Sequence, residues 1–377
     1  MNKDPALAPF GAITRFMPAP ALLVLAVTAI LFGVFSERWL ADLSNPVRVG
    51  VLFVWLFVAI VWGAIAAVHH AEHLADHLGE PYGTLILTLS VQSIEVMTLA
   101  VVMLSGFANP TLARDTIFSV VMIVLNGLLG LSLLLGGWRF HEQEYNLRGV
   151  NAYLSLILML SVFVLLLPDF IDSSSDPSFT RAQEGFVILM CLGLYGLFLV
   201  VQTHRHRSYF VIQNAGAQPA ATTSGAVRLI AVEAISLLVY LGLVIFLVRK
   251  LALVLNHALE VLHAPIALGA LVVAILVLAP EGVSAIRAAL RNDLQHAVNV
   301  LLGSVLATLA LTTTAILIIG LLHHTPVLLG LEGTQQPLLV LTLLLSAITF
   351  ANGVTNILQG AIHLMLFCGF LMLIFWP

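Results

Sequence analysis

The amino-acid sequence predicts an all-α polytopic membrane protein of about eleven transmembrane helices: one N-terminal helix followed by two inverted five-helix repeats. Its composition is the first observation that favours this fold class. Hydrophobic residues make up 60% of the 377 residues and charged residues only 9%. The mean hydropathy is +1.06. A soluble core of this size cannot bury so much apolar surface, so most of the chain is expected to lie in a bilayer.

The spacing of apolar runs is the second observation. A helix that crosses a bilayer needs about 20 predominantly apolar residues, and the expected helices end at charged residues or at Pro and Gly. The first run is expected to be an uncleaved helix rather than a signal peptide. A tight turn at Asn352 and Gly353 is the only separation between the last two runs. The expected spans lie near 20–36, 47–68, 83–105, 116–137, 151–168, 182–202, 227–248, 265–290, 297–322, 337–351 and 354–376.

The organisation of these runs is the third observation. The longest polar interruption begins with a basic run, ends in small residues and separates two groups of five spans. We therefore expect an N-terminal segment with the first helix (1–46), a first repeat (47–202), a cytoplasmic linker (203–226) and a second repeat (227–377). Because each repeat has an odd number of helices, the second is expected to enter the membrane with inverted topology.

The positive charges set the expected orientation. Lys and Arg are enriched in cytoplasmic loops. With the N-terminus inside, nine of the 15 Lys and Arg residues fall on the cytoplasmic side. We therefore expect a cytoplasmic N-terminus and an outside C-terminus.

The charge and the cysteine content argue against a nucleic-acid-binding protein and a disulfide-rich protein. The net charge of -4 provides no basic surface for nucleic acid, so no nucleic-acid partner is expected. Cys191 and Cys368 both lie in apolar runs, where a small hydrophobic side chain is the expected role, and no disulfide framework is indicated.

The run from Gly83 to Ser105 carries Glu95 near its middle. A carboxylate at the centre of a spanning helix costs a few kcal/mol or more unless it faces a cavity, a partner or an ion. Other polar residues recur with Glu95 at helical spacings of three and four and form one stripe with it: Thr84, Thr88, Gln92 and Thr98. This stripe is expected to line an aqueous or ion-binding cavity.

The second repeat carries a matching acid. Glu281 follows Pro280 in the eighth run, and proline is expected to kink the helix and free backbone carbonyls. The run after each acid has a polar stripe: Ser119 and Asn126 in the first repeat; Ser304, Thr308 and Thr312 in the second. Glu95 and Glu281 are the predicted metal ligands. The alternative is a structural acid pair, with Gln92, Asn126, Ser304 and Thr308 as ordinary interhelical hydrogen-bond partners.

Histidines form a separate hypothesis. His69, His73 and His77 share one helical face near Glu80, which favours either a regulatory metal or proton site or a solvated helix end at the interface. The second of these is the preferred interpretation. His363 lies in the middle of the last span, where it is either a neutral imidazole bonded to a carbonyl or a proton relay.

Three segments carry a resemblance to a known family. The segments are LADHLGEPYGTLILTLSVQSIEV, LAPEGVSAIRAALRNDLQHAVNVLLGSVLATLAL and NGVTNILQGAIHL. In these segments the chain resembles the calcium/proton exchanger family of the cation/calcium exchanger superfamily, and most closely its bacterial ChaA-type antiporters. The resemblance implies that Glu95 and Glu281 are the paired ion-binding glutamates and that the protein lies in a bacterial inner membrane.

The chain also departs from the family pattern. Asn352 and Gln359 stand where the family tends to have terminal acids, and the acidic linker is absent. Fewer anionic oxygens imply a weaker field around the ion, which puts strict calcium selectivity in doubt.

These observations predict a secondary active transporter rather than an enzyme, needing no cofactor, with metal cations, protons and the lipid bilayer as its partners. We expect exchange of Ca²⁺ for H⁺ by alternating access at the paired glutamates. The alternative is a monovalent Na⁺/H⁺ or K⁺/H⁺ antiporter on the same site. An intramembrane metalloprotease is disfavoured because the histidines lack a matched base, and a channel would need no proton coupling.

Overall fold

The fold is described by a computed structural model that covers residues 18–40, 43–78, 82–104, 111–171, 179–210, 224–324 and 327–376. The predicted all-α membrane fold is confirmed. In the described part, ten helices are long and apolar enough to cross a membrane. An eleventh, α13, is apolar but has only 15 residues.

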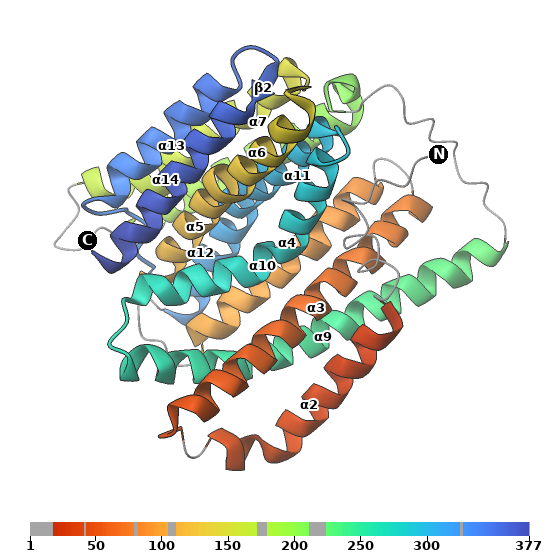
Figure 1. The fold of residues 1–377 in the computed structure, drawn as a ribbon, viewed down its shortest axis with the longest axis vertical. Coiled ribbons are helices and arrows are strands. Elements are labelled where there is room, and N and C mark those ends of the chain that lie inside the picture. Colours follow the sequence, from red (N-terminus) through yellow and green to blue (C-terminus); the bar gives the residue numbers. More distant parts are fainter. Residues whose placement is uncertain are drawn as a thin grey trace. The chain divides into compact units, whose positions relative to one another are not determined.

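The helices follow the predicted spans closely, although most are longer (Figure 1). Through residue 210 the elements are α2 (Pro18–Leu40), α3 (Pro46–Leu78), α4 (Tyr82–Leu104), α5 (Leu112–Met122), η2 (Ile123–Leu128), α6 (Leu129–Phe140), β1 (Glu142–Glu144), α7 (Leu147–Ser161), η3 (Val162–Leu166), η4 (Leu167–Phe170), α8 (Arg181–Val200), η5 (Val201–Arg205) and η6 (Arg207–Tyr209).

The remaining elements repeat this plan of long helices with short interruptions. They are α9 (Ser224–Val261), α10 (Ile266–Ala289), α11 (Leu294–Ala307), η7 (Thr308–Thr312), α12 (Thr313–His323), α13 (Gln335–Thr349), β2 (Val354–Asn356) and α14 (Ile357–Phe375). The α10 helix continues through Pro280.

The chain forms two compact units. The smaller unit contains residues up to Ile94 and residues 220–258, hence α2, α3, the start of α4 and most of α9. The larger unit contains residues 95–219 and 259–377. Each unit takes helices from both predicted repeats, so the repeat boundaries remain a prediction.

Contacts in the larger unit show how α13 crosses it. At one end, the Leu331 amide donates to the Leu165 carbonyl over 2.8 Å. At the other end, β1 pairs antiparallel with β2, and the side-chain amide of Gln143 donates to the backbone carbonyl of Ala289 over 2.9 Å. Because α13 joins the loop at Leu331 to β2, it runs from one end of the unit to the other.

Four π-helical segments occur in the spans of the described part of the chain. Two of them, η2 and η7, occupy the middle of the helices that follow the two acid-bearing helices. A π segment changes the register of side chains around a helix and often marks a functional site. The sequence did not predict these segments. They bring Asn126 in η2 and Thr308 in η7 into corresponding places in the two predicted repeats.

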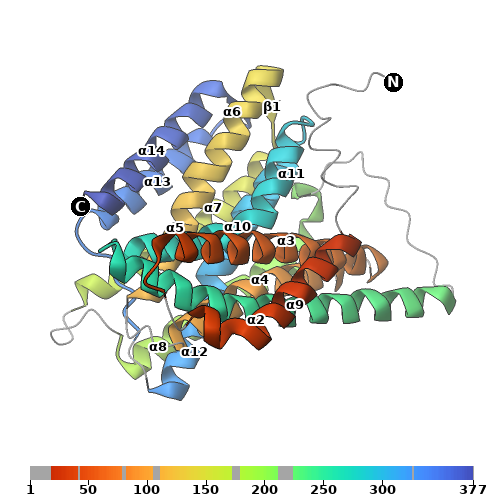
Figure 2. The same cartoon turned by 60° about the horizontal axis from the view of Figure 1, so that its bottom comes forward.

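Helices α6 and α14 pack closely in the larger unit, and both views show them side by side (Figure 1, Figure 2). A Cβ atom added at Gly360 would lie 2.8 Å from the Gly130 carbonyl oxygen, and one added at Gly130 would lie 2.9 Å from the Cβ of His363. Small residues at such an interface let two helix backbones approach closely.

We predict that Gly360→Val destabilises the protein by about 1–3 kcal/mol, because the added side chain must displace the α6 backbone. Gly369→Val is the matched control, since a Cβ at Gly369 meets nothing within 4 Å. Thermal unfolding of the two purified variants in the same detergent measures the difference. Equal melting temperatures would contradict the close packing.

Candidate functional site

Glu95 lies in α4 with only 3% of its surface exposed. Both of its carboxylate oxygens accept hydrogen bonds from η7. The Thr308 hydroxyl donates to Oε2 over 2.8 Å and the Thr312 hydroxyl donates to Oε1 over 3.0 Å. Two donors satisfy a buried carboxylate well, because hydrogen bonds to a charged acceptor are stronger than neutral ones. The structure thus brings the predicted residues Glu95 and Thr308 together.

Glu281 lies in α10 directly after Pro280 and is 7% exposed. It is close enough to Glu95 for the two carboxyl groups to interact electrostatically. Its Oε2 atom has no hydrogen-bond partner among the described residues. Two buried carboxylates repel each other, so the pair favours states in which a cation or protons neutralise it.

Thr98 lies one helical turn beyond Glu95 in α4 and is 1% exposed. Its hydroxyl oxygen is buried without a hydrogen-bond partner in the described part of the chain. Buried polar atoms are nearly always paired, so an orphaned one calls for an explanation. Carboxylate and hydroxyl oxygens are ligands that hard cations such as Ca²⁺ prefer. The orphaned oxygens of Thr98 and Glu281 therefore fit a cation site.

Asn126 and His363 form a second buried group in the larger unit, and both are 0% exposed. The Asn126 amide nitrogen donates to the Thr342 hydroxyl over 2.8 Å. Its amide oxygen lies 3.1 Å from His363 Nδ1, and His363 Nε2 lies 3.0 Å from the Thr349 hydroxyl. Because an amide oxygen only accepts, Nδ1 carries the hydrogen, and in a neutral ring Nε2 accepts from Thr349. His363 thus holds the amide of Asn126 in one orientation.

The other predicted ligands are less directly placed. Gln92 is buried in α4, three residues before Glu95, in the part of the helix that belongs to the smaller unit. Ser304 is partly exposed on α11, four residues before Thr308. Within the described chain it makes no hydrogen bond to Glu95 or Glu281. Asn352 is exposed, and Gln359 accepts from the Asn356 amide as part of the cap of α14.

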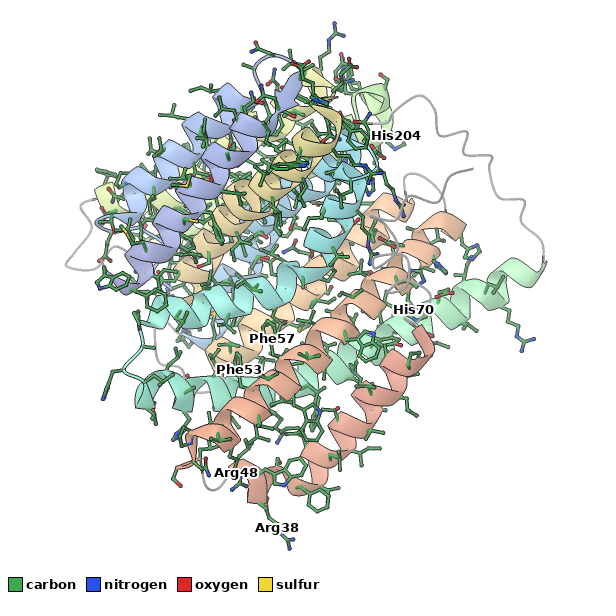
Figure 3. All side chains as sticks on the ribbon, viewed as in Figure 1. Arg38, Arg48, Phe53, Phe57, His70 and His204 are labelled. Atoms are coloured by element: carbon green, nitrogen blue, oxygen red, sulfur yellow. The ribbon has the colours of Figure 1, made fainter. Side chains whose placement is uncertain are left out.

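Two histidines of α3 lie close to Glu233 of α9, a residue that the sequence analysis did not single out. In the smaller unit, His70 Nδ1 lies 2.5 Å from Glu233 Oε2, and His73 Nδ1 lies 3.6 Å from Glu233 Oε1. The ring centroids of His69 and His73 are 4.3 Å apart. Figure 3 labels His70 on α3.

Of the predicted regulatory residues, the structure places His69 and His73 close together. His77 is exposed on α3, and Glu80 lies outside the described residues. The described residues contain no group of three His, Cys, Asp or Glu side chains that could hold a metal ion. The metal hypothesis for these histidines therefore gains no support. Glu233 was detectable in the sequence as a further acid inside an apolar run.

Thr98 and Thr312 belong to the predicted polar stripes, although neither was among the predicted ligands. Both had a signal in the sequence, because Thr98 follows Glu95 by one turn and Thr312 follows Thr308 by four residues. Only the structure shows that the Thr312 hydroxyl donates to Glu95 and that the Thr98 hydroxyl has no hydrogen-bond partner among the described residues.

The chain matches known proteins over nearly its whole length. Residues 49–204 and 229–376 match the profile of the family described as sodium/calcium exchanger protein. The sodium-potassium/proton antiporter ChaA of Escherichia coli is 38% identical over 92% of this chain and 96% of its own. The putative ionic transporter y4hA of Sinorhizobium fredii is 39% identical over 91% of this chain and 94% of its own.

Solved structures share the fold. Native YfkE has a TM-score of 0.72 and 19% identity, covering 95% of this chain and all of that one (100%). The H⁺/Ca²⁺ exchanger CAX has a TM-score of 0.63 and 12% identity, covering 92% of this chain and 88% of that one. At these identities the likeness concerns the fold alone.

We predict that Thr312→Val destabilises the protein more than Thr314→Val. The first change removes a hydrogen bond to a buried carboxylate, which is worth about 1.5–3 kcal/mol. The second removes a bond from the Thr314 hydroxyl to the Ala310 carbonyl within the same span and a weak bond with the neutral Cys191 thiol. Melting temperatures in detergent test this, and a larger loss for Thr314→Val would contradict the proposed support of Glu95.

Proposed function

Because the chain belongs to the sodium/calcium exchanger protein family, we propose that it is a proton-coupled cation antiporter whose cation and protons share Glu95 and Glu281. The observation that carries this proposal is the pair of buried, interacting carboxyl groups. An oxygen of Glu281 that lacks a hydrogen-bond partner among the described residues supports it.

Charge explains why the same site would favour exchange over leak. Two carboxylates are neutralised by one divalent cation or by two protons, so both loaded states are close to neutral. The empty state holds two unpaired negative charges in a buried place and is the costly one. Alternating access therefore favours exchange of the cation for protons, because a conformational change with the site empty costs the most free energy.

We assign the ligands by their contacts. Glu95 and Glu281 bind the cation and protons, and the hydroxyls of Thr98, Thr308 and Thr312 supply neutral oxygens near Glu95. Asn126 is a further candidate ligand, oriented by His363. Gln92 and Ser304 remain predicted ligands. In this proposal His363 acts on Asn126 and is also the candidate proton relay, because its two ring nitrogens join Asn126 to Thr349.

The histidines of the smaller unit keep a regulatory role in this proposal. His70 and His73 share the carboxylate of Glu233, so their protonation changes the charge balance between α3 and α9. The His69 ring lies next to the tilted His73 ring and extends this group. His77 and Glu80 remain predicted members of the regulatory site.

Calcium is the proposed main cation. Ca²⁺ takes six to eight oxygen ligands in flexible geometry, which carboxylates, hydroxyls and waters can supply together, whereas Mg²⁺ gives up its water reluctantly. A second candidate is exchange of Na⁺ or K⁺ for H⁺. The E. coli relative's name, sodium-potassium/proton antiporter, favours that alternative, and the described site contributes only two acids.

We predict that Ca²⁺ added to sealed vesicles containing the purified protein drives proton movement in the opposite direction, with a weaker response to Na⁺ or K⁺ and little to Mg²⁺. The monovalent response increases with pH, because fewer protons compete for the carboxylates. Glu95→Gln and Glu281→Gln abolish every response, since each keeps the size of the side chain and removes an anionic ligand.

A pH-sensitive dye inside the vesicles measures this flux. Glu260→Gln, which changes an exposed acid of the larger unit, is the control and retains full flux. Transport by either glutamine variant would refute the shared site. Proton movement with Na⁺ or K⁺ but never with Ca²⁺ would make the monovalent antiporter the correct assignment.

The protein is an integral membrane protein, and we propose the bacterial inner membrane as its location. We predict that reporter fusions at the N-terminus and near Arg205 report the cytoplasm, and that a fusion at the C-terminus reports the outside. The eleven-span arrangement supports opposite sides for the two ends, because an odd number of crossings separates them. Both ends on one side would contradict it.

A further inference from the structure

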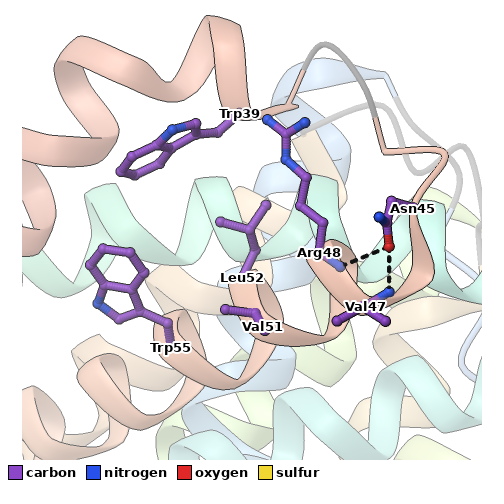
Figure 4. Close-up of a pocket in the computed structure, with 7 residues that line it drawn as sticks. All are labelled: Trp39, Asn45, Val47, Arg48, Val51, Leu52 and Trp55. Atoms are coloured by element: carbon purple, nitrogen blue, oxygen red, sulfur yellow. Dashed lines mark hydrogen bonds between the residues drawn. The ribbon is translucent and has the colours of Figure 1, made fainter.

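A cavity of about 340 Å³ lies between α2 and α3 in the smaller unit (Figure 4). Trp39 and Trp55 form one wall, Val51 and Leu52 line its apolar floor, and Arg48 lies at its edge. A volume of this size falls in the range of small-molecule sites, which combine a mostly apolar lining with a few polar groups. The antiporter site proposed above uses none of these residues.

The aromatic wall is held by its own packing. The ring centroids of Trp39 and Trp55 are 5.8 Å apart, and Phe32 contacts them at 5.3 Å and 5.6 Å. The Trp55 indole nitrogen also donates to the Thr28 hydroxyl over 3.2 Å. Trp side chains concentrate at membrane–water interfaces, where their rings pack at the level of lipid headgroups.

Exposed apolar side chains continue from the cavity along α3, and they include Val47, Val51 and Val54. The ligand that best fits a surface of this kind has a long hydrocarbon chain beyond its polar end. A lipid acyl chain meets this requirement, and a small soluble anion does not.

Positive charges gather at the polar end of the cavity. One N–H group of the Arg48 guanidinium donates to the Arg38 carbonyl over 2.9 Å. The guanidinium has five donors, so others remain for a ligand. Lys250 donates to the Ser36 hydroxyl over 3.1 Å, which brings a third cation to this end of α2. Figure 3 labels Arg38 and Arg48 here. Glu37, an exposed neighbour, offsets one of these charges.

We propose that this cavity binds an anionic phospholipid, with Arg48 on the phosphate and Trp39 and Trp55 against the start of an acyl chain. A guanidinium matches phosphate oxygens well because its donors form a planar fork. Arg38 and Lys250 add the preference for a headgroup with net negative charge over a zwitterionic one.

Native mass spectrometry of the purified full-length protein tests the proposal with phosphatidylglycerol and phosphatidylcholine of the same acyl chains. The protein retains phosphatidylglycerol more strongly. Arg48→Gln and Arg38→Gln each weaken its retention by about fivefold, the effect of one basic side chain near anionic lipid. Trp39→Leu weakens retention of both lipids. Arg181→Gln, which changes an exposed arginine of the larger unit, leaves retention unchanged.

Arg38→Gln keeps the proposal testable if Arg48→Gln disturbs the fold, because it removes a charge but keeps the backbone carbonyl that Arg48 binds. Melting temperatures identify any variant that is merely unfolded. Equal retention of the two lipids by the wild-type protein would overturn the proposal. Displacement of phosphatidylglycerol by inorganic phosphate at equal concentration would overturn it too, because the site would then be a simple anion site.

Discussion

The repulsion between two buried acids is the constraint on which the centre of this protein depends. Glu95 and Glu281 lie on different helices of an apolar protein and close enough to interact. Burying one ionised carboxylate costs free energy, and burying two together costs more unless a positive charge is present. The hydroxyls of Thr308 and Thr312 stabilise one of the two carboxylates. The other retains an oxygen with no protein partner in the described chain, so a bound cation or proton has a defined place to act.

The surrounding helices explain how these groups are held. The π segment η7 carries both threonines that donate to Glu95, and the corresponding segment η2 carries Asn126. Close packing of α6 against α14 at Gly130 and Gly360 brings His363 toward η2. The resulting network fixes the Asn126 amide through hydrogen bonds at both of its ends. Two of the π segments thus lie where polar side chains must be oriented inside a membrane.

Much of the fold was predictable because a bilayer imposes one strong rule. Every spanning segment must satisfy its own backbone, so apolar runs of sufficient length become helices. The positions of the spans and the importance of Glu95 and Glu281 followed from that rule and from the family resemblance. Even α13, with 15 residues, lies where its short apolar run predicted.

The rest depended on contacts between residues far apart in the chain. His70 and Glu233 pair across 163 positions, and Asn126 and His363 pair across 237. No local sequence pattern predicts which distant residue pairs with His70 or with Asn126. Hydropathy is also insensitive to whether a helical turn is α or π, so η2 and η7 were not foreseen. Gln359 stands where the family tends to have an acid, and only the structure shows that it accepts a hydrogen bond from the Asn356 backbone amide as a helix cap.

The most direct test of the shared carboxylate site is the number of protons released when a cation binds. Calorimetric titration of the detergent-purified protein with Ca²⁺, repeated in buffers of different ionisation enthalpy, gives that number. We predict that calcium binding releases protons and that the double variant Glu95→Gln, Glu281→Gln neither binds calcium nor releases protons. Calcium binding without any release of protons, at a pH where transport occurs, would contradict competition between the two cargoes for one site.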